Sequence, residues 1–255
     1  MRYRKSKNSN KGFTLIELAV VLVVVGIILG GFIGTLTSRI NVTKKSDALS
    51  DLEDIKQSMM AYSFVNGYLP CPDCAVVAGD CTTALVGDGV SDYNVGNARC
   101  SLNEAVGHVP WVTLGLGRGD SWGNHYRYAV QNEYADESVV FTLSSSAGIA
   151  SIKEPDFAAD NTGATAHSLA ENIVAIIFSH GSNGYGAISE DNLARTAIPA
   201  ANVDELENTD NDAEYYMRPE TSAETTIAGK EFDDIVIWIS EFELKAKMVE
   251  AGKLP

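Results

Sequence analysis

Residues 11–18 read Lys-Gly-Phe-Thr-Leu-Ile-Glu-Leu and open a long apolar run. No residue from Leu18 to Ser38 is charged, and most positions in that range hold Val, Leu, Ile or Gly. A run of this length is typical of a transmembrane helix, and it exceeds the apolar core of a cleaved secretory signal. The sequence therefore predicts a membrane-spanning helix at residues 13–38.

The two flanks of the apolar run differ in charge. Residues 1–12 carry basic side chains and no acid, whereas the whole chain has a formal net charge of −15. Basic flanks stay in the cytoplasm, so we expect a single pass through a bacterial inner membrane, with the chain after Arg39 in the periplasm. An acidic body repels phosphate backbones, so nucleic acid is not an expected partner.

The start of the apolar run carries a specific motif. Gly12 ends the basic leader, Phe13 follows it, and Thr-Leu-Ile-Glu leads to Glu17 at the edge of the apolar residues. This pattern resembles the type III signal of type IV prepilins and type II secretion pseudopilins. The resemblance implies that a prepilin peptidase removes residues 1–12 by cutting between Gly12 and Phe13, and that Phe13 is then N-methylated.

Glu17 is the fifth residue of the mature chain that this resemblance implies. In a helix, residues 13 and 17 lie about 6 Å apart along the axis. When staggered helices pack side by side, the Glu17 carboxylate can reach the terminal ammonium of Phe13 on another subunit, and each charge is costly alone in lipid. We therefore expect Glu17 to set the register of assembly with other subunits on an inner-membrane assembly platform.

Residues 39–66 form the amphipathic half of the same predicted helix. Apolar positions recur there every three or four residues, with charged residues between them: Leu49, Leu52, Ile55, Met59 and Tyr62. Gly67 and Pro70 end the pattern. The second half of the helix is thus expected to pack on a globular head formed by residues 67–255.

All four cysteines fall in the loop-rich stretch 67–108. Outside the cytoplasm an even count of this kind indicates two disulfides. Of the three pairings we favour Cys71–Cys100 with Cys74–Cys81. The C-x-x-C spacing also occurs in redox centres and in half zinc sites, but no βαβ pattern and no second C-x-x-C accompany it.

The head is expected to be an antiparallel sheet. Five β-branched or aromatic runs are bounded by turn residues: Trp111–Leu114, Tyr126–Val130, Ser138–Leu143, Ile173–Phe178 and Ile235–Ile239. The last run leads into a helix, so residues 233–252 form a strand and a helix. The predicted fold class is α+β, with a long N-terminal helix on the sheet.

Further motifs resemble pilin-like heads. Asp120–Asn124 is similar to a turn of the major type II pseudopilin, while Leu69–Asp73 and Val109–Leu116 are similar to pilin-like proteins with a cysteine loop. These resemblances imply a pilin-like fold. Residues 150–172 and 195–230 match neither group and are expected to be insertions.

The stretch Phe178–Gly184 suggests catalysis or metal binding only weakly. The Gly-x-Ser-x-Gly spacing of a hydrolase is absent, so we expect a turn, no catalytic residue and no enzyme. In the major pseudopilin the corresponding loop binds calcium, and Ser179 and Asp234 align with its ligands. Asn183 replaces an aspartate there, which weakens a calcium site, so calcium stays an alternative to no cofactor and no metal.

Other polar residues are expected to be structural. The four histidines share no ligand spacing. Asp88 and Asp92, with Asn94, indicate a solvated turn, and Asp204–Glu214 an exposed acidic loop.

The sequence thus favours a structural subunit of a type IV pilus or a type II secretion pseudopilus, polymerised through its N-terminal helix. One alternative is a minor pilin at the tip, whose head binds a ligand or a surface. Another is a membrane-anchored periplasmic redox or metal protein.

Overall fold

The computed structural model describes residues 14–76, 81, 85–93, 100, 105–138, 140–146, 150–155, 166–210, 212, 214–222 and 231–254, without the side chains of residues 29 and 31–38. The predicted leader 1–12 and Phe13 lie outside these residues, as does Asn94. The chain divides into two compact units, Met1–Thr43 and Lys44–Pro255.

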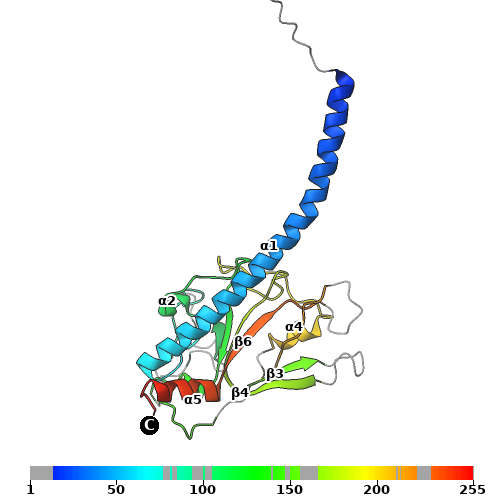
Figure 1. The fold of residues 1–255 in the computed structure, drawn as a ribbon. Coiled ribbons are helices and arrows are strands. Elements are labelled where there is room, and N and C mark those ends of the chain that lie inside the picture. Colours follow the sequence, from blue (N-terminus) through cyan, green and yellow to red (C-terminus); the bar gives the residue numbers. More distant parts are fainter. Residues whose placement is uncertain are drawn as a thin grey trace, which may run out of the picture. The chain divides into compact units, whose positions relative to one another are not determined.

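The fold is α+β, as predicted (Figure 1). In chain order the elements are α1 (Leu15–Asn66), β1 (Val106–His108), α2 (Trp111–Leu114), β2 (Arg127–Val130), the 3-10 turn η1 (Asn132–Tyr134), β3 (Ala150–Pro155), β4 (Ala166–Ser179), α4 (Val203–Glu207), β5 (Glu214–Tyr216), β6 (Ile235–Ser240) and α5 (Glu241–Glu250).

Helix α1 is 52 residues long and ends where the sequence predicts. Gly67 follows it with a φ of +91°, a conformation that glycine adopts without strain, and its N–H donates to the Ser63 carbonyl at 2.8 Å. Over the residues that are described, no helix combines the length and the apolar character of a membrane span. The span expected at residues 13–38 therefore stays a prediction.

The sheet is built around β4. The strand order is β1-β2-β4-β3-β5, and β6 also pairs with β4. All pairs are antiparallel except β3 with β5, so the predicted antiparallel sheet is correct for all but this one parallel pair. The C-terminal half of β4 pairs with both β2 and β6, which places it in the centre of the sheet.

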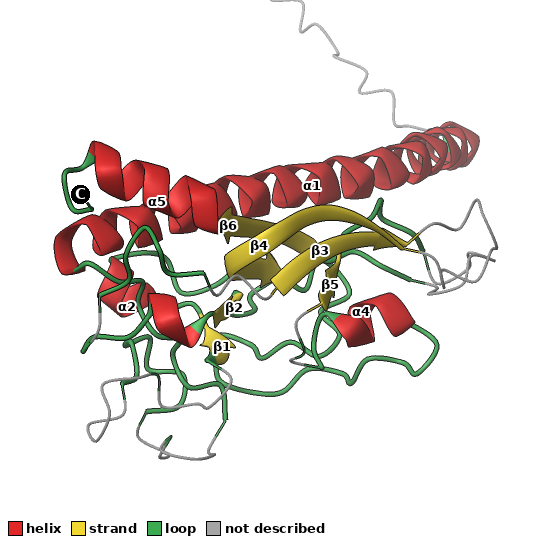
Figure 2. Ribbon diagram, turned by 90° about the horizontal axis from the view of Figure 1, so that it is seen from below, coloured by secondary structure: helices red, strands yellow, loops and turns green. Residues whose placement is uncertain are grey.

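Alternating side chains of β4 separate two cores. Ala175 and Ile177 join the larger core with residues 48–60 of α1, and Leu244 and Met248 of α5 join it too. Ile176 and Phe178 point to the opposite face and join a smaller core with β3, β5 and β6. Figure 2 shows α5 beside the C-terminal part of α1, both over one face of the sheet.

The apolar stripe on α1 agrees with the predicted one at most positions. Leu52 and Met59 are fully buried and Ile55 nearly so, whereas Leu49 is 45% exposed. Ala48 takes its place in the core. An ion pair between Lys56 and Glu243, at 2.9 Å, adds a polar contact between α1 and α5.

The strand predicted at Trp111–Leu114 is wrong, because these residues form the short helix α2. Pro110 precedes the turn, and Gly115 ends it with a φ of +70°. Proline before and glycine after a helical turn are its usual boundaries. The two caps therefore override the strand preference of Trp, Val and Thr in so short a segment.

The strand predicted at Ser138–Leu143 is also wrong, since none of its described residues lies in a strand. The Asp136 side chain accepts a hydrogen bond from the Ser138 N–H, and the Thr142 N–H donates to Ser145 Oγ. Lys245 on α5 donates to the Leu143 carbonyl at 2.9 Å. Side chains thus replace the strand partners that these backbone groups would need.

The two predicted insertions contribute to the sheet. Residues 150–155 form β3 and pair with the first half of β4, which itself begins at Ala166. Residues 214–216 form β5 and pair with β3. These segments thus extend the smaller core, where Ile152 and Tyr215 are both buried.

The contact of α1 with the sheet gives a first test. Leu52→Ala should lower the free energy of unfolding by about 2–5 kcal/mol, because the Leu52 side chain is fully buried and its removal leaves a cavity in the core. Leu49→Ala, on the exposed side of the same helix, is the matched control and should cost well under half as much. Denaturant unfolding of the full chain measures both, and equal losses would contradict the orientation of α1.

Candidate functional site

The predicted assembly residue Glu17 lies in the first turn of α1. Its Oε2 accepts hydrogen bonds from the Thr14 N–H and Thr14 Oγ1, both at 3.3 Å. In return, the Glu17 N–H donates to Thr14 Oγ1 at 3.3 Å. This reciprocal arrangement is a capping box. The sequence pattern Thr-x-x-Glu carries this signal, so Glu17 has a capping role in addition to the predicted role in assembly.

The four cysteines are joined in two disulfides. Cys71 bonds to Cys100 with an S–S distance of 2.04 Å, and Cys74 bonds to Cys81. These are the pairs favoured in the sequence analysis. Because the two cysteines of the C-x-x-C motif have different partners, that motif does not form the internal disulfide of a redox centre. None of the four sulfurs is left as a thiolate ligand in this structure.

Asp73, between the cysteines of the C-x-x-C motif, fixes this loop to the sheet. Its backbone exchanges two hydrogen bonds with His108 at the end of β1, at 3.0 and 2.8 Å. Gly107 permits the approach, since a Cβ there would lie 2.2 Å from the Asp73 carbonyl. The disulfide loop therefore joins the sheet at its β1 edge.

The Asp73 carboxylate is fully buried, and within the described part of the chain neither oxygen has a hydrogen-bond partner of normal geometry. Burial, and then the charge of Asp92, raise the pKa of Asp73 to about 8, although the amides of Gly89 and Gly87 oppose the shift. Asp92 itself is 4% exposed and accepts the Cys74 N–H at 2.7 Å. The solvated turn expected at Asp92 is therefore wrong, because the disulfide loop covers it.

Two histidines without a shared spacing lie together beside this loop. The rings of His108 and His125 are 4.7 Å apart, and Trp111 stacks on His125 at 4.7 Å and 7°. Arg118 covers the Trp111 ring at 5.5 Å. Burial lowers the pKa of His108 to about 3, so this ring is neutral and the group serves packing.

The turn Asp120–Asn124 is tied to the end of β4. Asp120 Oδ1 accepts the N–H groups of Trp122 and Asn124, both at 2.9 Å, and Oδ2 accepts Ser179 Oγ at 2.6 Å. The Ser179 hydroxyl is thus engaged by a carboxylate rather than by an imidazole. Its role is to hold two turns together.

The other serine of this loop is similarly engaged. Ser182 Oγ donates to Asp233 Oδ2 at 2.7 Å. His180 is buried, and its Nδ1 lies 3.9 Å from Asp234 Oδ1. No serine–histidine hydrogen bond joins these residues among the described contacts, so the arrangement offers no activated nucleophile.

The residues aligned with calcium ligands have separate partners. Ser179 bonds to Asp120, the Asn183 amide donates to Glu205 Oε1 at 2.7 Å, and Asp234 Oδ2 accepts the Asn208 amide at 2.8 Å. Each of the three side chains is thus hydrogen-bonded to a different residue in this structure, and calcium binding by this set stays a prediction. Two groups of carboxylates are close enough to hold a cation instead: Glu205 with Asp233 and Asp234, and Glu207 with Asp210 and Asp212.

The exposed loop expected at Asp204–Glu214 is wrong for its first residues. They form α4, where Asp204 is 2% and Glu205 1% exposed. Arg218 pairs with Asp204 at 2.5 Å, and its guanidinium lies 4.7 Å over the Phe232 ring. Contacts with residues distant in the sequence bury these acids, so the local composition could not reveal their burial.

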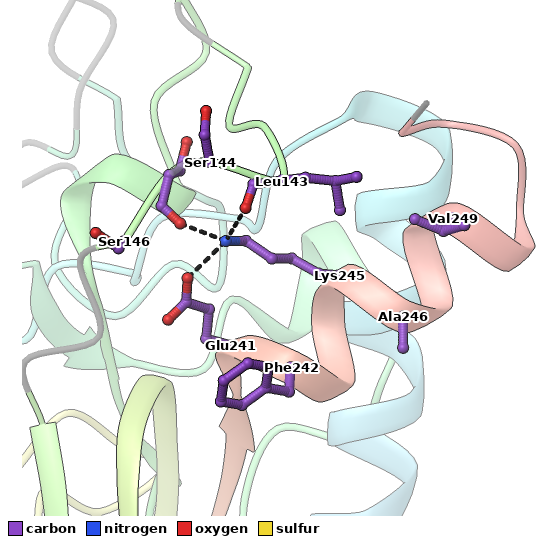
Figure 3. Close-up of a pocket in the computed structure, with 9 residues that line it drawn as sticks. Leu143, Ser144, Ser146, Glu241, Phe242, Lys245, Ala246 and Val249 are labelled. Carbon is purple, nitrogen blue, oxygen red and sulfur yellow. Dashed lines mark hydrogen bonds and ion pairs between the residues drawn. The ribbon is translucent and has the colours of Figure 1, made fainter.

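A surface groove of about 710 Å³ lies between residues 143–146 and α5 (Figure 3). Lys245 projects into it and bonds to the carbonyls of Leu143 and Ser145 and to Glu241 Oε1. Phe242, on the same helix, is 72% exposed. Because the Lys245 ammonium has three partners, the groove presents mainly apolar surface and serine hydroxyls.

The buried Asp73 makes stability depend on pH. Its pKa in the folded chain, about 8, exceeds the unfolded value of about 3.9. The stability that the protonated carboxyl contributes is therefore complete below about pH 4 and is lost as pH rises through about 8. Between about pH 5 and about pH 9, the wild type should therefore lose about 1–3 kcal/mol more unfolding free energy than Asp73→Asn does.

Unfolding at the two pH values measures this difference. Asp54→Asn, at an exposed residue of α1 whose charge is not among those that raise the pKa of Asp73, is the control and should follow the wild type. An Asp73→Asn variant whose stability falls with pH as steeply as that of the wild type would contradict the assignment.

Comparison with known proteins bears on the N-terminal segment. Residues 7–33 match the family model described as the prokaryotic N-terminal methylation motif. No curated protein and no solved structure matches the chain. The matched range includes Gly12, Phe13 and Glu17 together with most of the apolar run. The match identifies residues 7–33 as the prepilin-type signal of type IV pilins and pseudopilins.

Proposed function

We propose that the protein is a structural subunit of a type IV pilus or of a type II secretion pseudopilus. The observation that carries this proposal is the methylation motif at residues 7–33, which overlaps the first part of α1, a helix of 52 residues that begins at Leu15. Large apolar side chains between Leu15 and Ile28 are 43–90% exposed in the single chain. Such a surface needs lipid or other helices to cover it, and a membrane followed by a filament supplies both.

Processing in this proposal follows the prepilin route. A prepilin peptidase cuts between Gly12 and Phe13, and Phe13 is N-methylated. The basic leader keeps the N-terminus in the cytoplasm, residues 13–38 cross the inner membrane, and the head folds in the periplasm. Two disulfides suit that oxidising compartment. Assembly then occurs on an inner-membrane platform with other pilin or pseudopilin subunits.

The head acts as a scaffold rather than as an enzyme in this proposal. Support comes from the hydroxyls of Ser179 and Ser182, which are bonded to carboxylates. A minor pilin at the tip is the second candidate, and the apolar groove beside the exposed Phe242 favours it. A redox or metal-thiolate protein is less well supported, because all four cysteines are in disulfides.

The cleavage has a direct test. Mass spectrometry of the N-terminus in cells that contain prepilin peptidase should find a chain that begins with methylated Phe13. Cells without the peptidase should retain Met1. A chain that begins with Met1 in both strains would overturn the proposal, and cleavage at another bond would overturn the assignment of Gly12.

The role of Glu17 can be separated from helix capping. Glu17→Ala and Glu17→Gln should both be cleaved normally and be lost from sheared filaments, because both remove the charge that pairs with the Phe13 ammonium. Glutamine still completes a capping box. Quantitative detection in filament and membrane fractions measures the loss.

Thr14→Ala is the matched control. It removes the capping hydroxyl, at a cost of about 0.5–2 kcal/mol to the helix end, but keeps the Glu17 charge. This variant should still enter filaments. Normal assembly of Glu17→Gln would show that capping, not charge pairing, is what Glu17 contributes.

A further inference from the structure

Two faces of the head carry no unbalanced charge, although the protein is strongly acidic. The formal net charge of the chain is −15, and the basic leader partly offsets the acids, so the body that follows the leader is more acidic still. Two such bodies repel each other at close range unless the surfaces that meet are neutral. Neutral faces are therefore the places where a second copy of the chain can approach.

The first of them, which we call the α5 face, consists of the solvent side of α5 and residues 143–146 beside it (Figure 3). Phe242, Ala246 and Val249 recur at positions i, i+4 and i+7, so they form one exposed apolar stripe along the helix. Phe242 is 72% and Val249 44% exposed. With Leu143, which is 49% exposed, they line the groove of about 710 Å³.

The charges around this stripe cancel locally. All five charged residues of α5 form ion pairs, two pairs within the helix and one with α1: Glu241 with Lys245, Lys247 with Glu250, and Glu243 with Lys56. The three distances are 2.6, 2.9 and 2.9 Å. Phe242 and Val249 can therefore be covered by another surface without leaving a charge buried and unpaired.

The second face, which we call the α1–α2 face, is formed by the last turns of α1 and by α2. Residues 57–72 and 109–117, from which these elements come, contain no charged side chain at all. Between the two helices lies a groove of about 370 Å³, whose apolar and aromatic lining comes mostly from α1: Ala61, Tyr62, Val65 and Leu114. Val65 is 76% exposed, so this face also presents apolar surface to solvent.

The two faces lie on opposite sides of α1. Lys56 faces α5, where it pairs with Glu243, whereas Ser58 lines the groove beside α2. Successive residues of an α-helix are about 100° apart, so Lys56 and Ser58 are about 200° apart around the axis. Figure 1 shows α2 and α5 on either side of the last turns of α1. Two copies whose α1 helices lie parallel and side by side thus present different faces to each other.

This placement decides the symmetry of the contact. A contact between two α5 faces is isologous and closes after two copies, whereas a contact between an α5 face and an α1–α2 face is heterologous and repeats without end. A filament built from one chain requires the second kind. Phe242 is suited to be its anchor, because aromatic side chains seated in a groove contribute most of the energy of many interfaces.

We propose that the α5 face of one copy docks on the α1–α2 face of the next, with the Phe242 ring in the groove beside Tyr62 and Val65. The proposal rests on the proposed function, since the side-by-side packing of α1 helices brings the two faces together. If the α5 groove instead binds a ligand, as in a pilin at the tip, the cross-linking test below gives no product.

Cysteine cross-linking is the decisive test. All four native cysteines are in disulfides, so introduced cysteines report new contacts. A chain with both Val65→Cys and Phe242→Cys should give, in oxidised sheared filaments, a ladder of dimers, trimers and larger products that a reductant collapses. Each single variant should stay monomeric, because only the heterologous contact brings the two positions together.

The matched control pair is Val203→Cys with Phe242→Cys. Val203 is 48% exposed and lies on α4, which Figure 2 shows apart from α2 and α5. This pair has the same chemistry and a similar exposure, but it should give no ladder.

Phe242→Glu and Val65→Glu test the same contact without new cysteines. Both positions are exposed in the single chain, so the unfolding midpoint and the cleavage before Phe13 should match those of the wild type. The amount of each variant in sheared filaments should fall at least about tenfold, because the contact would bury an unpaired charge. Val203→Glu should assemble as the wild type does.

Three results would overturn the proposed contact and leave the proposed function standing. They are wild-type filaments without a ladder from the Val65 and Phe242 pair, normal assembly of Phe242→Glu, and a dimer from Phe242→Cys alone, which would mark an isologous contact. A wild-type chain that never enters filaments would overturn the proposed function and this contact with it, so the two failures are distinguishable.

Discussion

The contact between residues 48–60 of α1 and the central strand β4 governs the arrangement of the head. Leu52 and Met59 are fully buried against the face of β4 that carries Ala175 and Ile177. Because side chains alternate along a strand, this contact also decides which β4 residues face the smaller core. A shift of one residue in β4 would turn Ile176 and Phe178 towards α1 and break both cores.

Irregular segments are held to this frame by specific polar groups rather than by strand pairing. Lys245 binds the carbonyls of Leu143 and Ser145, and Asp120 joins its own turn to Ser179. The two disulfides do the same for the loop after α1, which packs with β1 through Asp73. The hydrogen bonds among these links satisfy backbone groups that would otherwise be buried without partners, and the disulfides constrain their loop covalently. Long loops can therefore cover the sheet without regular structure.

The burial of acidic side chains is the main destabilising feature of this fold. The chain is strongly acidic, and Asp73, Glu205, Asp233 and Asp234 are among the acids buried inside the head. For Asp73 the cost appears as a raised pKa, since burial favours its neutral form. For Glu205, Asp233 and Asp234 the carboxylates lie close together, so their repulsion adds to the cost of burial and raises the pKa of Asp234 further.

The amino-acid sequence by itself determined the helix over Leu15–Asn66, the strands β2 and β6, the C-terminal half of β4, and the helix α5, because periodicity and caps are local signals. It also carried the prepilin-type signal, which is a contiguous motif. The strand predicted at Trp111–Leu114 was wrong although Pro110 and Gly115, which bound the helix there, are local signals. Only the tertiary structure decided that Ser138–Leu143 is held by Lys245, and that Glu205 lies buried beside Asp233. Those outcomes depend on contacts across many residues of sequence, whose energies exceed the weak local preferences that a sequence pattern reports.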